Sequence, residues 1–571
     1  MVKEAAHAEG DSRIFADHGR PSVDGARAVP AKIGTVPVPA KMGTVPRLVI
    51  AGTASGVGKT SLVLGLTHEL ARRGLRVQTF KVGPDFLDPT WLALASGRPC
   101  YNLDGWMTSQ RYVVELFARA AGDADIALIE GVMGLFDGAS PVGLEGSTAE
   151  VAAWLDAPVL LVVPARGAGR SLAATVLGFA RFEPAVGIAG VIANQGGSAR
   201  HRAWLAEGLD SAGLPPLVGA VPRGALPPLP SRHLGLVTAA PGNLTPAILA
   251  RLADACRAHL DVEAILRKAE GGGGKGEGGA AGGQWSVVSC QLPVATDHGP
   301  RTTDLASFRL GVAWDEAFHF YYADNLEALE ARGVEICRFS PLADAGLPAD
   351  VAGVYLGGGY PELYAERLAA NEAMLCEIRA WAAAGRPLYA ECGGLMYLGR
   401  SLVTREGTRH AMAGVLPVET VVLDRLKTLG YVEVSLAADS LWGPAGAVCR
   451  GHEFHYSEIA ATSPLPPGEG QGVRGTCAAA RTSDAPSRRA SPGSVRSMVG
   501  RGGPEGWSAA YTVRRLRGEP VAEGFVRGNV LASYVHLHWA SRPEVADRLV
   551  AAMAARAQAG DRRRVHEEAK L

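Results

Sequence analysis

The chain has 571 residues, too many for one hydrophobic core to organise, and so we expect two or more domains. Its 57 basic and 57 acidic residues cancel, which excludes the strong basic footprint of a nucleic-acid or membrane-surface protein and favours a small-molecule substrate. We also expect a cytoplasmic protein with reduced thiols, because the eight cysteines form no CxxC pair, no apolar run approaches the ~20 residues that span a bilayer, and no hydrophobic signal core precedes the first domain.

Residues 1–45 are rich in Ala, Pro, Gly and charged residues, and they contain the duplication AKIGTVP and AKMGTVP. Such a segment cannot bury enough apolar surface to offset the entropy lost on ordering, so we predict a disordered tail. The duplication could be a partner motif, although the composition favours a neutral extension.

Residues 46–267 alternate apolar runs with helix-length segments; the runs include RLVIAGTA, VQTFKVG, ADIALIEGV and APVLLVVPA. Strands that are apolar on both faces are typical of a parallel sheet covered by helices on both sides. We therefore predict an α/β fold with an N-terminal phosphate-loop domain. The glycine-rich segment that follows, within residues 268–305, has the composition of a flexible linker.

The stretch AGTASGVGKTS stands between the first predicted strand and an amphipathic helix. In that context backbone N–H groups and the helix N-terminus point at an anion. Five residues separate Gly52 from Gly58 where the common pattern has four, so the loop is a variant. We predict that Lys59 reaches the β- and γ-phosphates of ATP and that Thr60 helps to hold magnesium. The predicted ATP-binding residues are Gly52, Gly56, Gly58, Lys59, Thr60, Ser61 and Asn194, the last presenting its amide to the adenine edge.

Four carboxylates follow later strands: Asp85 and Asp88 in FKVGPDFLDPTW, and Glu130 and Asp137 in LIEGVMGLFDG. Ligands of an open parallel sheet bind at the carboxyl ends of its strands, and hard carboxylate oxygens suit magnesium. Singly, Asp88 and Asp137 could equally be turn formers, because each precedes Pro or Gly. Four carboxylates beside one phosphate loop favour a site.

A second α/β pattern covers residues 306–550, first as FRLGVAWD, VEICRFSP, VAGVYLGGGYPELY and RPLYAECGGL, then as shorter strands. A Pro-, Gly-, Ser- and Arg-rich insert at 462–506 interrupts this domain, and we predict a disordered excursion whose deletion spares both sites. Residues 551–571 form a charged C-terminal tail in this interpretation.

The motif LYAECGGLMYL places Cys392 after an apolar strand and before a helix-compatible run. A nucleophile on so sharp a turn is exposed at the sheet edge, and a helix N-terminus lowers the pKa of a thiol. Gly358 and Gly359 in YLGGGYPELY are candidates for the oxyanion hole. The base could be His536 or His538 in YVHLHW, and spacing does not decide between them. A lone cysteine is more often an inert residue of the core. The prediction therefore rests on the combination of the turn, the glycine loop and the late histidine.

Nine motifs, in chain order, resemble those of the cobyrinic acid a,c-diamide synthases, called hydrogenobyrinic acid a,c-diamide synthases in the aerobic pathway: GTASGVGKTS, KVGPDFLDP, LDGWM, EGVMGLFDG, LPSRHLGL, YLGGGYPE, ECGGLMYL, RGHEFHYS and SYVHLHW. The resemblance implies an ATP-dependent amide synthase domain similar to dethiobiotin synthetase, joined to a class I glutamine amidotransferase-like α/β domain. Such a ligase of cobalamin biosynthesis would use ATP, Mg²⁺ and L-glutamine to amidate the a- and c-acetate carboxylates through acyl phosphates.

The resemblance also implies residue roles. In the synthase domain, Thr60, Asp85 and Glu130 would bind the metal, and Asp88 and Asp137 the substrate. In the glutaminase domain Cys392 would attack glutamine. Similarity to the cobyric acid synthases, whose corresponding motif matches at its first histidine, assigns the proton shuttle to His536.

The glutaminase motifs depart from the amidotransferase pattern at one position. Many class I enzymes have a glutamate two residues after the histidine, and this chain has His538 there. The third member of the triad is thus left open, and Glu453 in RGHEFHYS is a candidate substitute.

Alternatives remain open at this stage. They are a related tetrapyrrole amidase such as cobyric acid synthase or one acting on a nickel sirohydrochlorin, a switch-type phosphate-loop ATPase, and an inactive scaffold. The sequence does not indicate whether the substrate, cobyrinic or hydrogenobyrinic acid, contains cobalt, and a homodimer is one assembly to test. No nucleic acid or membrane partner is expected.

Overall fold

The computed structural model describes residues 45–229, 231–232, 235–236, 244–270, 308–460 and 506–555. The predicted N-terminal tail, the glycine-rich part of the linker and the predicted insert lie outside these ranges, apart from a residue at their edges.

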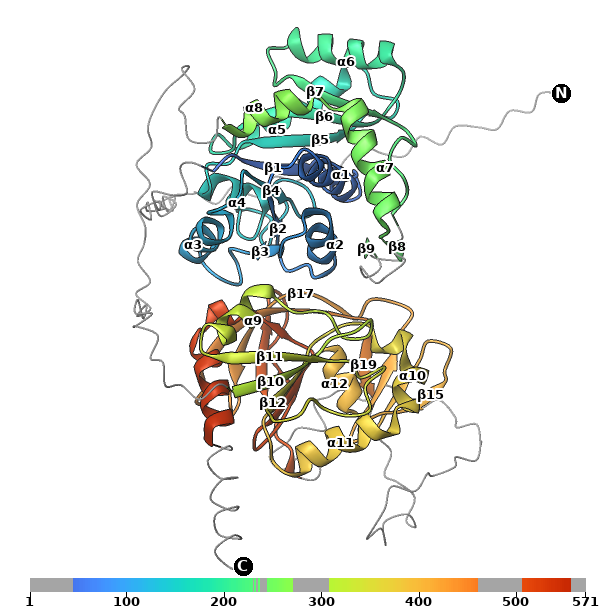
Figure 1. Ribbon diagram of the computed structural model, residues 1–571. Coiled ribbons are helices and arrows are strands. Elements are labelled where there is room, and N and C mark those ends of the chain that lie inside the picture. Colours follow the sequence, from blue (N-terminus) through green and yellow to red (C-terminus); the bar gives the residue numbers. More distant parts are fainter. Residues whose placement is uncertain are drawn as a thin grey trace, which may run out of the picture. The chain divides into compact units, whose positions relative to one another are not determined.

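The N-terminal domain is built on a seven-stranded parallel sheet with the order β3-β2-β4-β1-β5-β6-β7 (Figure 1). Its strands are β1 (Arg47–Gly52), β2 (Val77–Val82), β3 (Tyr101–Leu103), β4 (Ile126–Glu130), β5 (Val159–Pro164), β6 (Ile188–Gly196) and β7 (Leu217–Pro222). Because β4 lies between β1 and β2, the carboxyl ends of these three strands meet at one edge of the sheet. This confirms the predicted parallel α/β class.

Helices cover both faces of this sheet, and alternate strand residues enter two separate cores. Leu48 packs in one core and Val49 in the other, as expected for a period of two. The Leu48 face carries α1 (Lys59–Arg72), α2 (Leu87–Ser96), α7 (Pro246–His259) and α8 (Val262–Glu270). The Val49 face carries α3 (Gln110–Ala121), α4 (Thr148–Trp154), α5 (Ser171–Phe182) and α6 (Ala199–Asp210). Figure 1 shows α1 and α7 side by side. A two-residue pair, β8 (Ser231–Arg232) and β9 (Gly235–Leu236), precedes α7.

The C-terminal domain is built on a six-stranded sheet with the order β11-β10-β12-β13-β23-β22. Its strands are β10 (Phe308–Ala313), β11 (Val334–Phe339), β12 (Val351–Leu356), β13 (Leu388–Glu391), β22 (Phe525–Arg527) and β23 (Val530–Ser533). All neighbours pair in parallel except β22 and β23. The domain's helices are α9 (Ala323–Glu330), α10 (Ala365–Ala370), α11 (Glu372–Ala383) and α12 (Gly393–Leu398), with the short 3-10 turns η2 (Pro361–Leu363) and η5 (Trp539–Ser541).

Two smaller sheets contribute to the two cores of this domain. The four-stranded sheet contains β14 (Ser401–Val403), β15 (Arg409–Ala411), β16 (Glu419–Val422) and β19 (Ser457–Ala460), and Leu402 packs with Leu356 of β12. The five-stranded sheet contains β17 (Thr428–Leu436), β18 (Val448–His455), β20 (Tyr511–Arg515), β21 (Val521–Glu523) and β24 (His536–Leu537), and Val434 packs with Val312 of β10.

The described chain ends in a helical stretch, residues 544–555. Met553 of this stretch is fully buried in the second core. The folded domain therefore extends beyond residue 550, where the sequence analysis placed its end.

Two candidate active sites

The phosphate loop connects β1 to α1 and depends on glycine at specific positions. Gly56 and Gly58 have left-handed φ values of 75° and 97°, which glycine adopts without strain. A Cβ at Gly58 would lie 2.3 Å from Nδ2 of Asn194, so no larger residue fits. Asn194 in turn donates that amide to the carbonyl of Val57 at 2.8 Å, and its Oδ1 accepts from the Gln195 N–H at 2.9 Å. The Asn194 side chain thus braces the loop, and its predicted contact with adenine stays a prediction.

Lys59 is the first residue of α1, followed by Thr60 and Ser61, and its side chain folds back over the loop. Its Nζ donates to the carbonyls of Ala54 at 3.1 Å and Met133 at 2.5 Å. Burial, together with the nearby ammonium of Lys81, lowers the pKa of Lys59 to about 8. The lysine is therefore held where an added negative charge, such as a phosphate, would stabilise its protonated form.

A buried charge network lies at the carboxyl ends of β2 and β4. Glu130 Oε1 accepts from Thr60 Oγ1 at 2.5 Å and from Lys81 Nζ at 3.1 Å. Lys81 also donates to Asp88 Oδ2 at 2.5 Å. Sequence reasoning did not single out Lys81, although a lysine inside the otherwise buried strand VQTFKV was the available signal. The network joins the phosphate loop to two of the predicted carboxylates.

The carboxylates of this network differ in how easily they ionise. Burial, with a further contribution from Asp88, raises the pKa of Asp85 to about 8, and burial raises that of Glu130 to about 7 even though Lys81 opposes it. Burial also disfavours an ionised Asp88, but Lys81 overcomes it and lowers the Asp88 pKa. The fixed cation of Lys81 is thus paired most closely with Asp88, while Asp85 and Glu130 bind protons more readily than ordinary carboxylates do.

Two further features limit the metal prediction. Asp137 accepts the Gly134 N–H through Oδ2 at 2.9 Å, and Asp85 accepts the Leu87 N–H through Oδ1 at 2.8 Å, so each has one oxygen in a turn. Among the described residues, no group of three or more His, Cys, Asp or Glu side chains is arranged as a metal centre. A magnesium ion would therefore need ATP oxygens as ligands, which is its ordinary behaviour in nucleotide sites.

The glutaminase candidate centres on Cys392, which lies between β13 and α12. Its φ and ψ of 46° and −99° fall in a region that a residue with a side chain rarely adopts, a strain of about 1–3 kcal/mol. The surrounding backbone holds this turn, because the Cys392 N–H donates to Ser533 O at 2.7 Å and the Gly394 N–H to Gly357 O at 3.1 Å. A Cβ at Gly394 would lie 2.3 Å from the Leu356 carbonyl oxygen. The close approach explains the second of the two glycines after the cysteine.

Gly358 and Gly359 lie beside the nucleophile turn. The amide nitrogen of Gly359 is 3.1 Å from the Cβ position of Gly393, the residue after the nucleophile. The Gly358 carbonyl accepts the N–H groups of His319 and Phe320, both at 3.0 Å, which fixes the loop. The arrangement is compatible with the predicted oxyanion hole.

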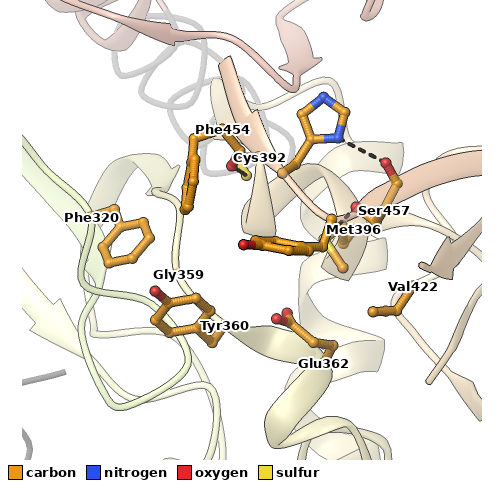
Figure 2. A pocket seen from close by; sticks show the side chains of 11 residues that line it. Phe320, Gly359, Tyr360, Glu362, Cys392, Met396, Val422, Phe454 and Ser457 are labelled. Carbon is orange, nitrogen blue, oxygen red and sulfur yellow. Dashed lines mark hydrogen bonds between the residues drawn. The ribbon is translucent and has the colours of Figure 1, made fainter. Parts of the chain in front are cut away.

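A pocket opens in front of Cys392, as Figure 2 shows. The residues lining it are Phe320, Gly359, Tyr360, Glu362, Cys392, Met396, Val422, Phe454, His455, Tyr456 and Ser457. Burial, with a smaller contribution from Glu362, raises the pKa of the Cys392 thiol well above its usual value, although the Gly393 N–H acts in the opposite direction. The helix N-terminus thus acts in the expected direction, but desolvation is the larger effect and raises the pKa of Cys392 overall.

The two histidines of YVHLHW occupy different surroundings. The Cε1 atom of His536 lies 2.3 Å from the Cβ position of Gly358, so its ring rests against the glycine loop. His538 accepts the Ala540 N–H through Nδ1 at 3.4 Å, which caps η5, and its Nε2 is 3.3 Å from Asp324 Oδ2. His536 thus lies against the loop of the predicted oxyanion hole while His538 caps a turn, and the assignment of the base to His536 stays a prediction.

The proposed substitute for the third triad member is engaged elsewhere. Arg515 binds Glu453 with two hydrogen bonds of 2.7 and 2.9 Å, one to each carboxylate oxygen. A different carboxylate, Glu391, lies 3.7 Å from Nδ1 of His536 through its Oε2. Sequence reasoning missed Glu391 although it directly precedes Cys392.

Both domains match known protein families. Residues 48–236 match the CobQ/CobB/MinD/ParA nucleotide binding domain, and residues 309–478 match the CobB/CobQ-like glutamine amidotransferase domain. The cobyrinate a,c-diamide synthase of Syntrophotalea carbinolica is 53% identical over 501 residues, which are 88% of this chain and 97% of that protein. The chain belongs to the cobyrinate a,c-diamide synthase family.

More distant members of the family align over most of the chain as well. The cobyrinate a,c-diamide synthase of Salmonella typhimurium is 38% identical, covering 88% of this chain and 97% of its own length. The hydrogenobyrinate a,c-diamide synthase of Rhodobacter capsulatus is 44% identical, covering 72% and 89% respectively. In the part of the chain that the structure describes, every helix is too short or too polar to cross a bilayer.

Proposed function

We propose that the protein is a glutamine-hydrolysing carbon–nitrogen ligase that amidates the a- and c-acetate carboxylates of cobyrinic or hydrogenobyrinic acid in cobalamin biosynthesis. Its membership of the family supports this activity. The observation that carries it is the presence, in one chain, of a lysine-bearing phosphate loop and a cysteine on a strained strand-to-helix turn. ATP activates the acid, and the cysteine supplies the nitrogen.

The synthase reaction needs a leaving group, because a carboxylate does not react with ammonia at neutral pH. A carboxylate oxygen of the substrate attacks the γ-phosphorus of ATP, the bond to the β-phosphate oxygen breaks, and an acyl phosphate and ADP result. Lys59 compensates the charge of the phosphates, with the loop amides around it. Ammonia then attacks the acyl carbon and phosphate leaves, giving the amide.

Magnesium is part of the proposal, with Thr60, Asp85 and Glu130 as its protein ligands. The hydrogen bond of 2.5 Å between Thr60 and Glu130 supports a shared position for these groups. When bound, the ion would neutralise phosphate charge. Asp88 and Asp137 are proposed to face the substrate; Asp88 is kept ionised by Lys81.

The glutaminase reaction proceeds through a thioester. His536 takes the Cys392 proton as sulfur attacks the side-chain amide carbon of glutamine. The tetrahedral oxyanion would be held by the amides of Gly358 and Gly359, and His536 returns the proton to the leaving nitrogen, so that ammonia departs. Water then hydrolyses the thioester to glutamate.

Three further statements belong to the proposal. Free ammonia is mostly protonated at neutral pH and would be diluted by solvent, which favours a sheltered path from the thioester site to the acyl phosphate. The supply of ATP and glutamine favours a cytoplasmic location. A homodimer is the assembly to test first, by sedimentation.

The test supplies cobyrinic acid and hydrogenobyrinic acid separately, each with ATP, Mg²⁺ and either glutamine or ammonium. Mass spectrometry should show a diamide of at least one acid with both nitrogen donors, with two ADP released per diamide. Exclusive action on the preformed a,c-diamide would instead indicate a cobyric acid synthase. ATP hydrolysis without any corrinoid amide from either donor would refute the proposal.

A further inference from the structure

We propose that Glu391 is the positioning residue of the glutaminase, orienting His536 and balancing its charge in place of the glutamate that this chain lacks after His536. The inference rests on the proposed glutaminase activity and adds a residue to it. It follows from where the carboxylate lies, from what holds it there, and from the neutrality of the other groups around the histidine.

Glu391 is next to the nucleophile in the sequence and close to the proposed base in space. It is the last residue of β13 and directly precedes Cys392. Its Oε1 accepts the backbone N–H of Leu537, the residue after His536, at 3.1 Å, and its Oε2 lies 3.7 Å from His536 Nδ1. Glu391 and His536 are 2% and 1% exposed, so water does not screen the pair.

Two tyrosines fix the carboxylate. The hydroxyl of Tyr355 donates to Oε2 at 3.0 Å and that of Tyr389 to Oε1 at 2.5 Å. Burial raises the pKa of both hydroxyls well above the usual value, so they remain proton donors at neutral pH. With the Leu537 amide, Glu391 receives three hydrogen bonds, the environment that stabilises an ionised carboxylate. Its one ion-pair partner among the described residues is His536.

The ring of His536 lies near Glu391 without a hydrogen bond to it. Its Nδ1 is buried and, within the described part of the chain, makes no hydrogen bond. A separation of 3.7 Å is too long for a hydrogen bond, but a shift of about 1 Å would close it to the usual length of a charge-assisted contact. Catalytic contacts are often long before substrate binds. A proton on Nδ1 then leaves Nε2 free to accept the proton of the thiol.

The other titratable groups that the structure describes around His536 are neutral or already paired. His452 stacks on its ring with centroids 5.0 Å apart, and burial lowers the His452 pKa well below its usual value. Burial likewise lowers the pKa of His455 to about 4. Glu453 is bound to Arg515. The carboxylate that remains to balance an imidazolium at His536 is Glu391.

The decisive variant is Glu391→Gln in the full-length protein, assayed with glutamine and separately with ammonium. We expect glutamine-dependent turnover to fall about 10–100-fold, the usual range for a partner that orients a functional histidine, while ammonium-dependent amidation is unchanged. The acidic limb of the pH profile for glutamine kcat/KM should move to lower pH, because the imidazolium loses its counter-ion. Glu453→Gln should leave that limb in place.

Alkylation of Cys392 by iodoacetamide gives a second readout that does not need turnover. It should slow at neutral pH in Glu391→Gln, since less thiolate–imidazolium pair forms. Should Glu391→Gln not fold, Tyr389→Phe, which keeps the carboxylate but removes one of its donors, should shift the same limb in the same direction by less. An unmoved limb in the folded variant, or equal loss with both nitrogen donors, would overturn the inference. A wild-type protein that releases no glutamate from glutamine would refute the proposed function instead.

Discussion

The two catalytic centres share one local design but differ in charge. Each lies at the carboxyl edge of a parallel sheet, on a strand-to-helix turn that needs glycine. The synthase site gathers two lysines and three carboxylates, of which Asp88 and Glu130 are buried, and the carboxylates beside Lys81 balance its charge. The glutaminase site surrounds a protonated thiol with neutral histidines and tyrosines, and Glu391 is its buried carboxylate beside the base.

The difference shows that the effect of burial on a pKa depends on whether an oppositely charged group lies beside the buried one. Lys81 stays charged in the synthase site because Asp88 and Glu130 outweigh its desolvation, which raises its pKa. Cys392 has no cation beside it in the described structure, so desolvation decides and the thiol stays protonated. The synthase site thus already holds charged groups before a nucleotide binds. In the glutaminase site, by contrast, the thiolate forms only when the base removes the proton of Cys392.

The largest expected effect separates the two centres by function. Cys392→Ser should reduce glutamine-dependent amidation at least ~10³-fold, as loss of a nucleophile does, and leave ammonium-dependent amidation unchanged. Parallel assays of amide formation with the two donors measure this. Cys376→Ser is the control and should resemble wild type with both. Loss with ammonium as well would contradict the division of labour.

The complementary change acts on the synthase centre. Lys59→Met should lower amidation with either nitrogen donor by about 10²–10³-fold, because a group that stabilises transition-state charge is gone. Glutamate release from glutamine should persist in the same preparation. Lys268→Met, which removes a lysine of α8, controls for loss of positive charge. Unchanged turnover in Lys59→Met would show that the loop lysine does not act on ATP.

The charge balance of the synthase site can be broken directly. Lys81→Met leaves Asp88 and Glu130 buried without their cation and should destabilise the N-terminal domain by about 3–5 kcal/mol. Thermal unfolding should show a lower midpoint temperature for the first transition. The double variant Lys81→Met with Asp88→Asn should recover part of that loss, because one buried charge disappears with its partner. Equal midpoint temperatures in wild type and Lys81→Met would contradict a stabilising role for the charge network.

The same site predicts a pH dependence without mutation. The pKa of Asp85 is raised to about 8 and that of Glu130 to about 7, so the folded state binds more protons than the unfolded state between the ordinary and the raised values. The stability they contribute is fully present below about pH 4, is lost progressively as pH rises from there to 7–8, at up to about 1.4 kcal/mol per pH unit for each group, and changes little above pH 8. Thermal unfolding of the ligand-free protein from pH 5 to 9 should show this decline and its flattening above pH 8.

Two comparisons sharpen this pH prediction. Asp85→Asn should flatten the decline, because the protonated acid and the amide are both neutral. Added Mg²⁺ and ATP should stabilise wild type more at pH 8 than at pH 6, since the proposed metal ligands are then ionised. A decline of the same slope in Asp85→Asn would count against the assignment.

The smallest expected effect concerns the brace of the phosphate loop. Asn194→Ala removes the hydrogen bond to the Val57 carbonyl, which is worth about 1 kcal/mol. The KM for ATP should rise roughly fivefold at nearly constant kcat with ammonium as donor. Thr175→Ala, on the exposed side of α5, serves as the control. An unaltered KM would mean that the loop keeps its shape without Asn194.

The sequence by itself determined the local designs and the fold class. The glycine loop before Lys59 and the turn at Cys392 are readable because a strand, a glycine-rich turn and a helix follow each other within a dozen or so residues. The doubly apolar strands likewise predict a parallel sheet, since the alternation of faces is a local property of a strand.

Only the tertiary structure decided which distant groups meet. Lys81 reaches Glu130 because β2 and β4 are neighbours in the sheet, and Glu391 reaches His536 because β13 and β24 bring residues from two parts of the chain together. The raised pKa of Cys392 follows from the same cause. Contact and burial depend on strand order and packing, and neither is encoded in the spacing of residues along the chain.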